Sequence, residues 1–246
     1  RYKVNRLTGD PLKPSPLFGH GPDFGYFYFG SIWYGDELWN NGAMKDYNGD
    51  GVYDDYDGLV WDEEENGGRG FKPWTPFTHP ELGEVEIGGF HPKFFGQNGP
   101  PWQLEDWARK QALFNLAMAQ RLPELKVEAP EVKKISDGVF EISLSWTNVG
   151  GLPVALEQAK LVKIVQEDRV SLEFDKELME GYENAKVKIT SPELYDKTIY
   201  AGHTGKGETK KVTFRVEVNM DDEVTGKIKL SSTRGGFISQ EITLNN

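Results

Sequence analysis

The chain of 246 residues is long enough for one large domain or two ordinary ones, and its hydrophobic content of 37% fits a folded soluble protein. The absence of cysteine excludes disulfides, thiolate metal sites and a cysteine nucleophile. The net charge of −11 argues against binding nucleic acid through phosphate neutralisation. No apolar run is long enough to span a membrane.

The first segment with a chemical signature covers residues 30–39, where one carboxylate, Glu37, lies in a run of aromatic and apolar residues. Burial beside Trp33 and Leu38 would disfavour its charged form and make Glu37 a candidate general base. The alternative is a hydrogen-bonded structural residue in an aromatic strand. Asp36 is adjacent, but neighbouring strand residues point to opposite faces, so the two do not form a catalytic pair.

The twelve residues 46–57 (DYNGDGVYDDYD) have the spacing of a calcium-binding loop. Oxygen-bearing side chains fall at loop positions 1, 3, 5, 9 and 12, and Gly51 occupies position 6, where the backbone must turn sharply. Position 12 carries an aspartate in place of the usual glutamate, so a shorter carboxylate must reach the ion, or a neighbour must help. The alternative is a solvated acidic turn. The expected ligands are Asp46, Asn48, Asp50, the carbonyl of Val52, Asp54 and Asp57.

The acidic charge is concentrated around this loop. Residues 46–65 carry nine carboxylates and no basic residue, and calcium would neutralise part of them. Loops of this type usually need extracellular or periplasmic calcium levels. We therefore expect a secreted, periplasmic or cell-surface protein, and the start at Arg1 favours a processed product or a fragment. Residues 62–65 read as a solvated acidic turn, with a second calcium ligand as the alternative.

Residues 103–122 predict an amphipathic helix that Pro123 ends. Its apolar stripe is interrupted by Gln111. The helix closes a first region, residues 1–125, that is rich in aromatic residues, glycine and proline, and a linker around Pro130 leads into a second region, residues 126–246. The stripe consists of Leu104, Trp107, Ala108, Phe114, Ala117 and Met118.

The second region predicts an all-β, immunoglobulin-like sandwich. Residues 139–146, 185–190, 211–218 and 226–230 alternate apolar and polar side chains, which is typical of strands with one buried face. Polar turns between them favour antiparallel pairing. The segment from Thr147 to Pro153 reads as a turn.

The first region resembles the zinc carboxypeptidases of the carboxypeptidase A type. Gly30 followed seven residues later by Glu37-Leu38-Trp39 resembles the Gly-(x)6-Glu-Leu strand of that family, and residues 21–24 resemble its preceding Gly-Ser-x-Asp-Trp motif. Residues 76–89 resemble a segment that follows the catalytic strand in large bacterial members, and the helix at 103–122 resembles the closing helix. The resemblance covers residues 10–125, so it implies the later part of an α/β catalytic domain.

By this resemblance Glu37 matches the general base, which takes a proton from zinc-bound water and passes it to the leaving amine. The family also needs a His-x-x-Glu pair and a later histidine as zinc ligands. None of His20, His79, His91 or His203 begins such a pair, so zinc is expected only with an upstream part of the same polypeptide. We therefore expect this chain alone to be inactive.

Two functions from different classes follow. One is a fragment of a secreted bacterial zinc carboxypeptidase-like peptidase that hydrolyses peptides in its intact form. The other is a calcium-stabilised, non-catalytic module that binds peptide or carbohydrate on a peptidase-like scaffold. For carbohydrate, the candidate platform is Trp61, Trp74 and Trp102, although tryptophans in so aromatic a region are more often part of a core.

Overall fold

The computed structural model describes residues 21–36, 38–39, 45–179, 185–193, 197–220 and 222–245. These residues form two compact units. The smaller unit comprises residues 35–117, and the larger unit combines the residues before 35 with those from 118 onward. Among the described residues, no helix is long and apolar enough to cross a membrane.

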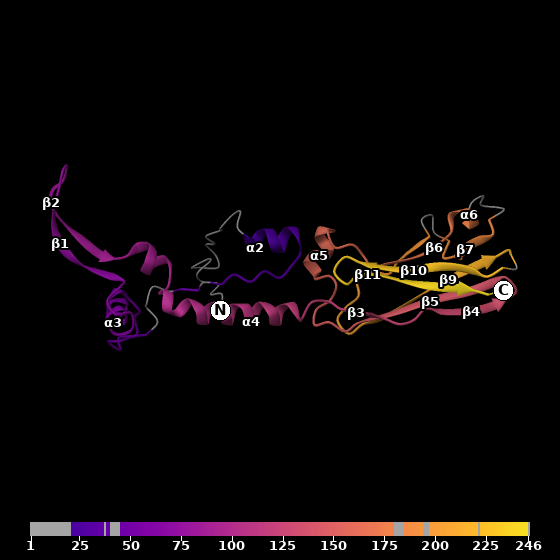
Figure 1. Cartoon of the computed structure of the whole chain (residues 1–246), viewed down its shortest axis with the longest axis horizontal. Coiled ribbons are helices and arrows are strands. Elements are labelled where there is room, and N and C mark those ends of the chain that lie inside the picture. Colours follow the sequence, from indigo (N-terminus) through magenta and orange to yellow (C-terminus); the bar gives the residue numbers. More distant parts are fainter. Residues whose placement is uncertain are drawn as a thin grey trace. The chain divides into compact units, whose positions relative to one another are not determined.

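The larger unit contains a β-sandwich of two antiparallel sheets (Figure 1). In one sheet, β5 (Val139–Asn148) pairs with β9 (Thr209–Val218), which in turn pairs with β7 (Val187–Ser191). The other edge of β5 carries β3 (Leu125–Val127) and β4 (Glu131–Ser136) in succession. The second sheet has the order β11 (Gly236–Leu244), β10 (Val224–Ser232), β6 (Arg169–Phe174) and β8 (Thr198–Tyr200).

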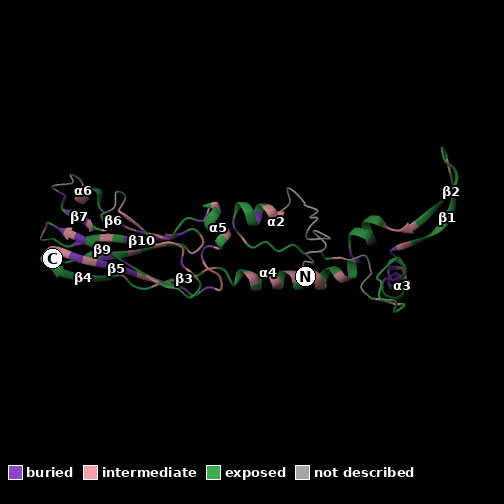
Figure 2. Ribbon diagram, turned by 180° about the vertical axis from the view of Figure 1, so that it is seen from behind, coloured by how far each residue is buried: buried purple, intermediate pink, exposed green. Residues whose placement is uncertain are grey.

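The core of the sandwich follows from the alternation of its strands. Every second residue of β5 is buried, and Phe140, Ile142, Leu144 and Trp146 point into one cluster shared with the apolar residues of β6, β9 and β10. In Figure 2 the buried residues appear as alternating bands along the strands of this unit. The hydrophobic effect thus fixes the register of β5 against its neighbouring strands, because a shift by one residue would turn these side chains to solvent.

Short helical segments complete the larger unit. They are α2 (Gly21–Asp23), η1 (Phe24–Tyr28), α5 (Glu157–Val162) and α6 (Lys176–Met179). Directly after η1, Gly30 has a φ of 59° and lies so close to α5 that an added Cβ would come within 2.2 Å of the Ala159 Cα. A side chain at position 30 would therefore both strain the backbone and push α5 away.

The smaller unit consists of a helix, a hairpin and the start of a long helix. Its elements are α3 (Asp55–Glu65), β1 (Phe71–His79), β2 (Gly83–Phe90), η2 (Pro92–Gln97) and most of α4 (Pro101–Ala119). β1 and β2 pair antiparallel. A small aromatic core holds the unit together, with Trp61 and Phe95 buried, Trp39 packed on both and Trp107 packed on Trp39.

The structure agrees with part of the secondary structure predicted from the sequence. Three of the four segments with period-two alternation lie wholly in strands, and residues 185–190 overlap β7 from Val187 onward. The expected helix is α4, which begins two residues earlier than expected and ends at Ala119. No residue of α4 is buried, although Trp107, Phe114 and Met118 of the expected stripe are half-buried. The α/β architecture expected for residues 1–125 is not seen in the described part of that region, where the strands before Leu125 form a single antiparallel hairpin.

The strand expected around Glu37 also differs from the structure. Residues 30–36 form neither helix nor strand, and Glu37 itself lies outside the described residues. A strand needs a neighbour to accept its backbone hydrogen bonds, and none of the described strands pairs with this segment.

Candidate functional site

The loop at residues 46–57 is organised by its own acidic side chains. Asp46 accepts the backbone N–H groups of Gly49 at 2.6 Å and Gly51 at 2.8 Å through its two carboxylate oxygens. Asn48 accepts from the backbone of Asp50 at 3.0 Å, and Asp50 accepts from that of Val52 at 2.7 Å. Each acceptor closes a local turn. Gly51 has a φ of 80°, the conformation that the sharp turn at position 6 requires.

The second half of the loop leads into α3, which begins at Asp55, the tenth loop position. Asp54 caps the helix by accepting the backbone N–H of Tyr56 at 2.9 Å. Asp57 is fully buried, and it accepts the backbone N–H of Asp54 at 3.2 Å and that of Tyr47 at 2.7 Å. Asp57 thus completes a capping box and ties the two ends of the loop together.

The carboxylates after the loop add to its negative field. Burial raises the pKa of the Tyr47 hydroxyl, and the charges of Glu65 and Glu64 raise it further. Within the described part of the chain, no three carboxylate or imidazole groups converge as a ready metal cluster. The loop acids instead accept hydrogen bonds from the loop backbone, and each carboxylate oxygen keeps a further lone pair for a cation.

The residues on either side of Glu37 are anchored in the smaller unit. Asp36 accepts a hydrogen bond of 2.6 Å from the side chain of Gln111 in α4. Trp39 donates its indole N–H to the carbonyl of Phe95. Its ring centroid lies 5.3 Å from that of Trp61. Gln111, which interrupts the apolar stripe of the helix, therefore has a polar partner next to the candidate base.

Two of the described histidines cap local turns, and the third contacts a distant backbone carbonyl. The Nδ1 atom of His79 accepts the backbone N–H groups of Glu81 at 3.2 Å and Leu82 at 3.1 Å, at the tip of the β1–β2 hairpin. His91 caps η2 in the same way, and the Nε2 atom of His203 lies 3.0 Å from the carbonyl of Val165. Among the described residues none of these three belongs to a group of three or more metal-ligating side chains, and His20 lies outside those residues.

Residues 124–243 match a domain of unknown function, DUF8731. No curated protein matches the chain. Among solved structures, the GAE domain of GGA2p from Saccharomyces cerevisiae is similar at 14% identity, 50% coverage of this chain, 89% coverage of that chain and a TM-score of 0.25. The β-glucosidase DesR from Streptomyces venezuelae, in complex with D-glucose, is similar at 13% identity, 50% and 15% coverage and a TM-score of 0.26.

Asp62 has a role that the sequence reasoning missed. Residues 62–65 form the last turn of α3 rather than a solvated turn, and Asp62 is fully buried. Its carboxylate accepts from the side chain of Asn66 at 2.7 Å and from the backbone of Gly70 at 2.7 Å and Phe71 at 3.0 Å. Asp62 thereby fixes the turn between α3 and β1. The glycines at positions 67, 68 and 70 were the available signal, since they mark a turn beside the helix end.

The roles of three buried polar residues in the region that matches DUF8731 were also missed. Asp168 and Thr204 are fully buried, and Thr204 donates both its backbone N–H and its hydroxyl to Asp168 while accepting the indole N–H of Trp146 at 2.9 Å. Asn148 lies in the expected turn and holds the start of β3 by accepting the backbone N–H of Glu124 at 3.2 Å. These contacts join positions far apart in the chain, so no local pattern could reveal them.

The tryptophans divide between the core and the surface. Trp61 is 3% exposed and belongs to the aromatic core of the smaller unit, whereas Trp74 and Trp102 are 58% and 51% exposed. Trp102 donates its indole N–H to the side chain of Asn66 at 3.3 Å. The expected three-residue platform is therefore reduced to two exposed rings.

Proposed function

We propose that residues 46–57 bind calcium, with Asp46, Asn48, Asp50, Asp54, Asp57 and the carbonyl of Val52 as ligands. The observation that carries the proposal is the position of Asp57. This buried carboxylate closes the loop at its twelfth residue and lies in the first turn of α3. The last of the proposed ligands therefore has a fixed position at the end of the loop. A hard cation that takes six to eight oxygens is the natural ligand for such a donor set.

The proposed ion would act as a structural clamp. Asp46, Asp50 and Asp54 repel one another at neutral pH, and a divalent cation would replace that repulsion by attraction. The loop connects the segment around Glu37 with α3, so stabilising it would restrict both neighbours. Because extracellular calcium levels suit such a loop, we infer a secreted, periplasmic or cell-surface location.

Calcium titration of the 246-residue chain tests this proposal. We expect calcium to raise the midpoint of thermal unfolding of the wild-type chain and to leave the Asp46→Ala variant unchanged. Asp55→Asn is the matched control, because Asp55 is exposed and occupies loop position 10, which supplies no ligand. Equal responses of Asp46→Ala and wild type would refute the assignment.

We further propose that residues up to about 125 are the later part of a zinc carboxypeptidase-like domain and that Glu37 is the general base of the intact enzyme. The support is the Gly30 to Trp39 motif, together with the anchoring of Asp36 and Trp39 on both sides of Glu37. Glu37 would accept a proton from the water that attacks the peptide carbonyl and deliver it to the leaving amine. No group of three metal-ligating side chains occurs among the described residues, so no zinc ligand is assigned within them.

Peptide hydrolysis by the intact polypeptide, with and without Glu37→Gln, tests the catalytic proposal. Loss of a general base typically lowers the rate by about 100- to 10,000-fold, while calcium binding should persist. Asp36→Asn is the matched control, because the asparagine side chain can still accept the hydrogen bond from Gln111, so kcat should change little. Unchanged hydrolysis in the Glu37→Gln variant would rule out the proposed base.

The second candidate is a calcium-stabilised module that binds peptide or carbohydrate without catalysis. Its specific support is the exposure of Trp74 and Trp102, since exposed aromatic rings provide stacking surfaces. A glycan or peptide array would detect such binding, and the double variant Trp74→Ala/Trp102→Ala should abolish it. Hydrolysis that depends on Glu37 would exclude this candidate.

A further inference from the structure

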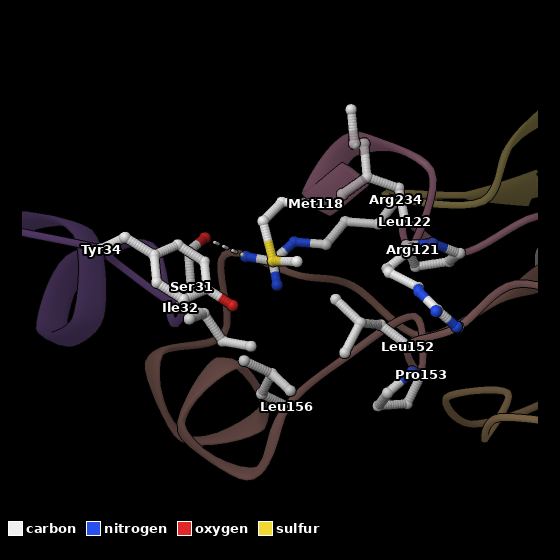
Figure 3. Close-up of a pocket in the computed structure, with 13 residues that line it drawn as sticks. Ser31, Ile32, Tyr34, Met118, Arg121, Leu122, Leu152, Pro153, Leu156 and Arg234 are labelled. Atoms are coloured by element: carbon white, nitrogen blue, oxygen red, sulfur yellow. Dashed lines mark hydrogen bonds between the residues drawn. The ribbon is translucent and has the colours of Figure 1, made fainter. Parts of the chain in front are cut away.

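A pocket of about 570 Å³ lies within the larger unit, at the end of the sandwich where β3 begins. Its walls come from the irregular segment after η1, the last turn of α4, the loop between β5 and α5, and the turn between β10 and β11. Figure 3 shows Ile32, Leu152 and Leu156 around this space. The volume is in the range of small-molecule sites, and most of the lining is apolar.

The charge of the pocket is opposite to that of the chain. Two arginines, Arg121 and Arg234, line it, and none of the described residues in its lining is acidic, in a chain with a net charge of −11. A cationic and otherwise apolar cavity favours a ligand with an anionic group and an apolar body. The apolar body packs against the walls, and the anionic group pairs with guanidinium.

Arg234 is held in place by the protein itself. It donates to the carbonyl oxygens of Phe29 and Gly30 and to the hydroxyl of Ser31, the last contact being drawn in Figure 3. A guanidinium group has five N–H donors, so these three bonds leave donors for a further acceptor. Burial lowers the pKa of Arg234, and its charge would be stabilised by an anionic partner.

Arg121 is positioned by packing. A Cβ added at Gly151 would lie 2.8 Å from the Cδ atom of Arg121, so the glycine leaves the space that the arginine stem occupies. The stem lies along the pocket wall while the exposed head keeps its charge in water. Arg121 thus adds positive charge at the rim of the pocket.

We propose that this pocket binds an aliphatic monocarboxylate, with the carboxylate at Arg234 and the hydrocarbon chain against Ile32, Leu152 and Leu156. The two donors left on Arg234, its Nε–H and one Nη1–H, can form charge-assisted hydrogen bonds, which favour a carboxylate over a neutral polar head. The proposal is independent of the calcium site and of peptidase activity, because it uses residues of the larger unit alone.

Titration of the 246-residue chain with octanoate, followed by amide chemical shifts, tests the proposal. We expect saturable shifts at Ile32, Leu152 and Leu156, weaker binding of octan-1-ol, and no binding of octylammonium. Arg121→Gln should weaken octanoate binding several-fold, since it removes a positive charge beside the carboxylate site. Arg109→Gln, an exposed arginine of α4 outside the pocket, is the charge-matched control and should bind as wild type.

A second pair of variants tests the site without touching either arginine. Ala119 lines the pocket, so Ala119→Glu places a carboxylate there and should abolish octanoate binding, whereas Ala112→Glu on the same helix should not. Glutamate is a good helix former, so both variants should fold. Equal binding of octanoate and octan-1-ol, or equal effects of Arg121→Gln and Arg109→Gln, would overturn the proposal, as would absence of octanoate binding.

Discussion

The buried carboxylate of Asp57 accepts the backbone N–H of Tyr47, ten residues earlier in the chain, at 2.7 Å. This one contact closes the loop, because Tyr47 follows its first position and Asp57 is its last. The same carboxylate also accepts from Asp54 at the start of α3. The loop is thus held closed by protein contacts, and calcium would have to add to a geometry that already exists.

Replacing Asp57 by alanine should destabilise the loop even without calcium. Two backbone N–H groups lose their acceptor, and we expect a cost of about 1–3 kcal/mol in the free energy of unfolding. Urea unfolding in the presence of a chelator measures this. Asp55→Ala, an exposed acid of the same helical turn, should cost less, about 0.3–1 kcal/mol, through the helix dipole alone. A smaller effect for Asp57→Ala than for Asp55→Ala would contradict the structural role.

The sequence predicted those features that repeat locally. The strand β5 was predictable because alternate residues such as Phe140 and Ile142 face one core, and α4 because its apolar stripe ends at Pro123. The strand β4 was not predicted, because all its residues are exposed and its sequence has no apolar–polar alternation to detect. The buried role of Asp168 was not predicted, because its partner Thr204 lies 36 residues away and only the folded chain brings the two together.

Removing the hydroxyl of Thr204 should destabilise the sandwich. In Thr204→Val the shape is kept, but the indole N–H of Trp146 loses its acceptor and Asp168 loses a donor inside the core. An unsatisfied buried group costs roughly 1–3 kcal/mol, so we expect a loss of about 2–4 kcal/mol. Denaturant unfolding followed by far-UV circular dichroism measures this loss.

Thr209→Val is the matched control for that variant. The hydroxyl of Thr209 lies 2.8 Å from that of Thr147 on the exposed side of the sheet that contains β5 and β9. Water can replace this contact, so the change should be within about 0.5 kcal/mol. Similar losses for Thr204→Val and Thr209→Val would show that burial of the network does not set its contribution.

A side chain at position 70 should loosen the smaller unit. A Cβ added to Gly70 would lie 2.2 Å from a ring carbon of Phe95 and 2.7 Å from the Asp62 carboxylate. Gly70→Ala should therefore cost about 1–3 kcal/mol through overpacking. Hydrogen exchange of the β1 and β2 amides measures it. Gly96→Ala is the control, because the nearest atom to its Cβ would be 3.8 Å away. Equal exchange rates in both variants would argue against close packing at position 70.

The ion pair between Glu173 of β6 and Lys229 of β10 should make the stability of the sandwich depend on acid. The hydrogen bond from Lys229 lowers the pKa of Glu173, the charge of Lys229 adds to this, and the charge of Lys227 contributes less. Because the pKa is lowered in the folded state, the stabilisation is present above the ordinary glutamate pKa of about 4.3 and is lost as the pH falls through the lower folded value.

Lys229→Met should raise the pKa of Glu173, measured by NMR titration of its side-chain carboxyl carbon, and should remove this part of the acid dependence. Lys227 lies directly opposite Glu173 in the strand register, so Lys227→Met is a control that removes the same charge at a closer register position. A larger pKa change in Lys227→Met than in Lys229→Met would mean that register, rather than the hydrogen bond, determines the titration of Glu173.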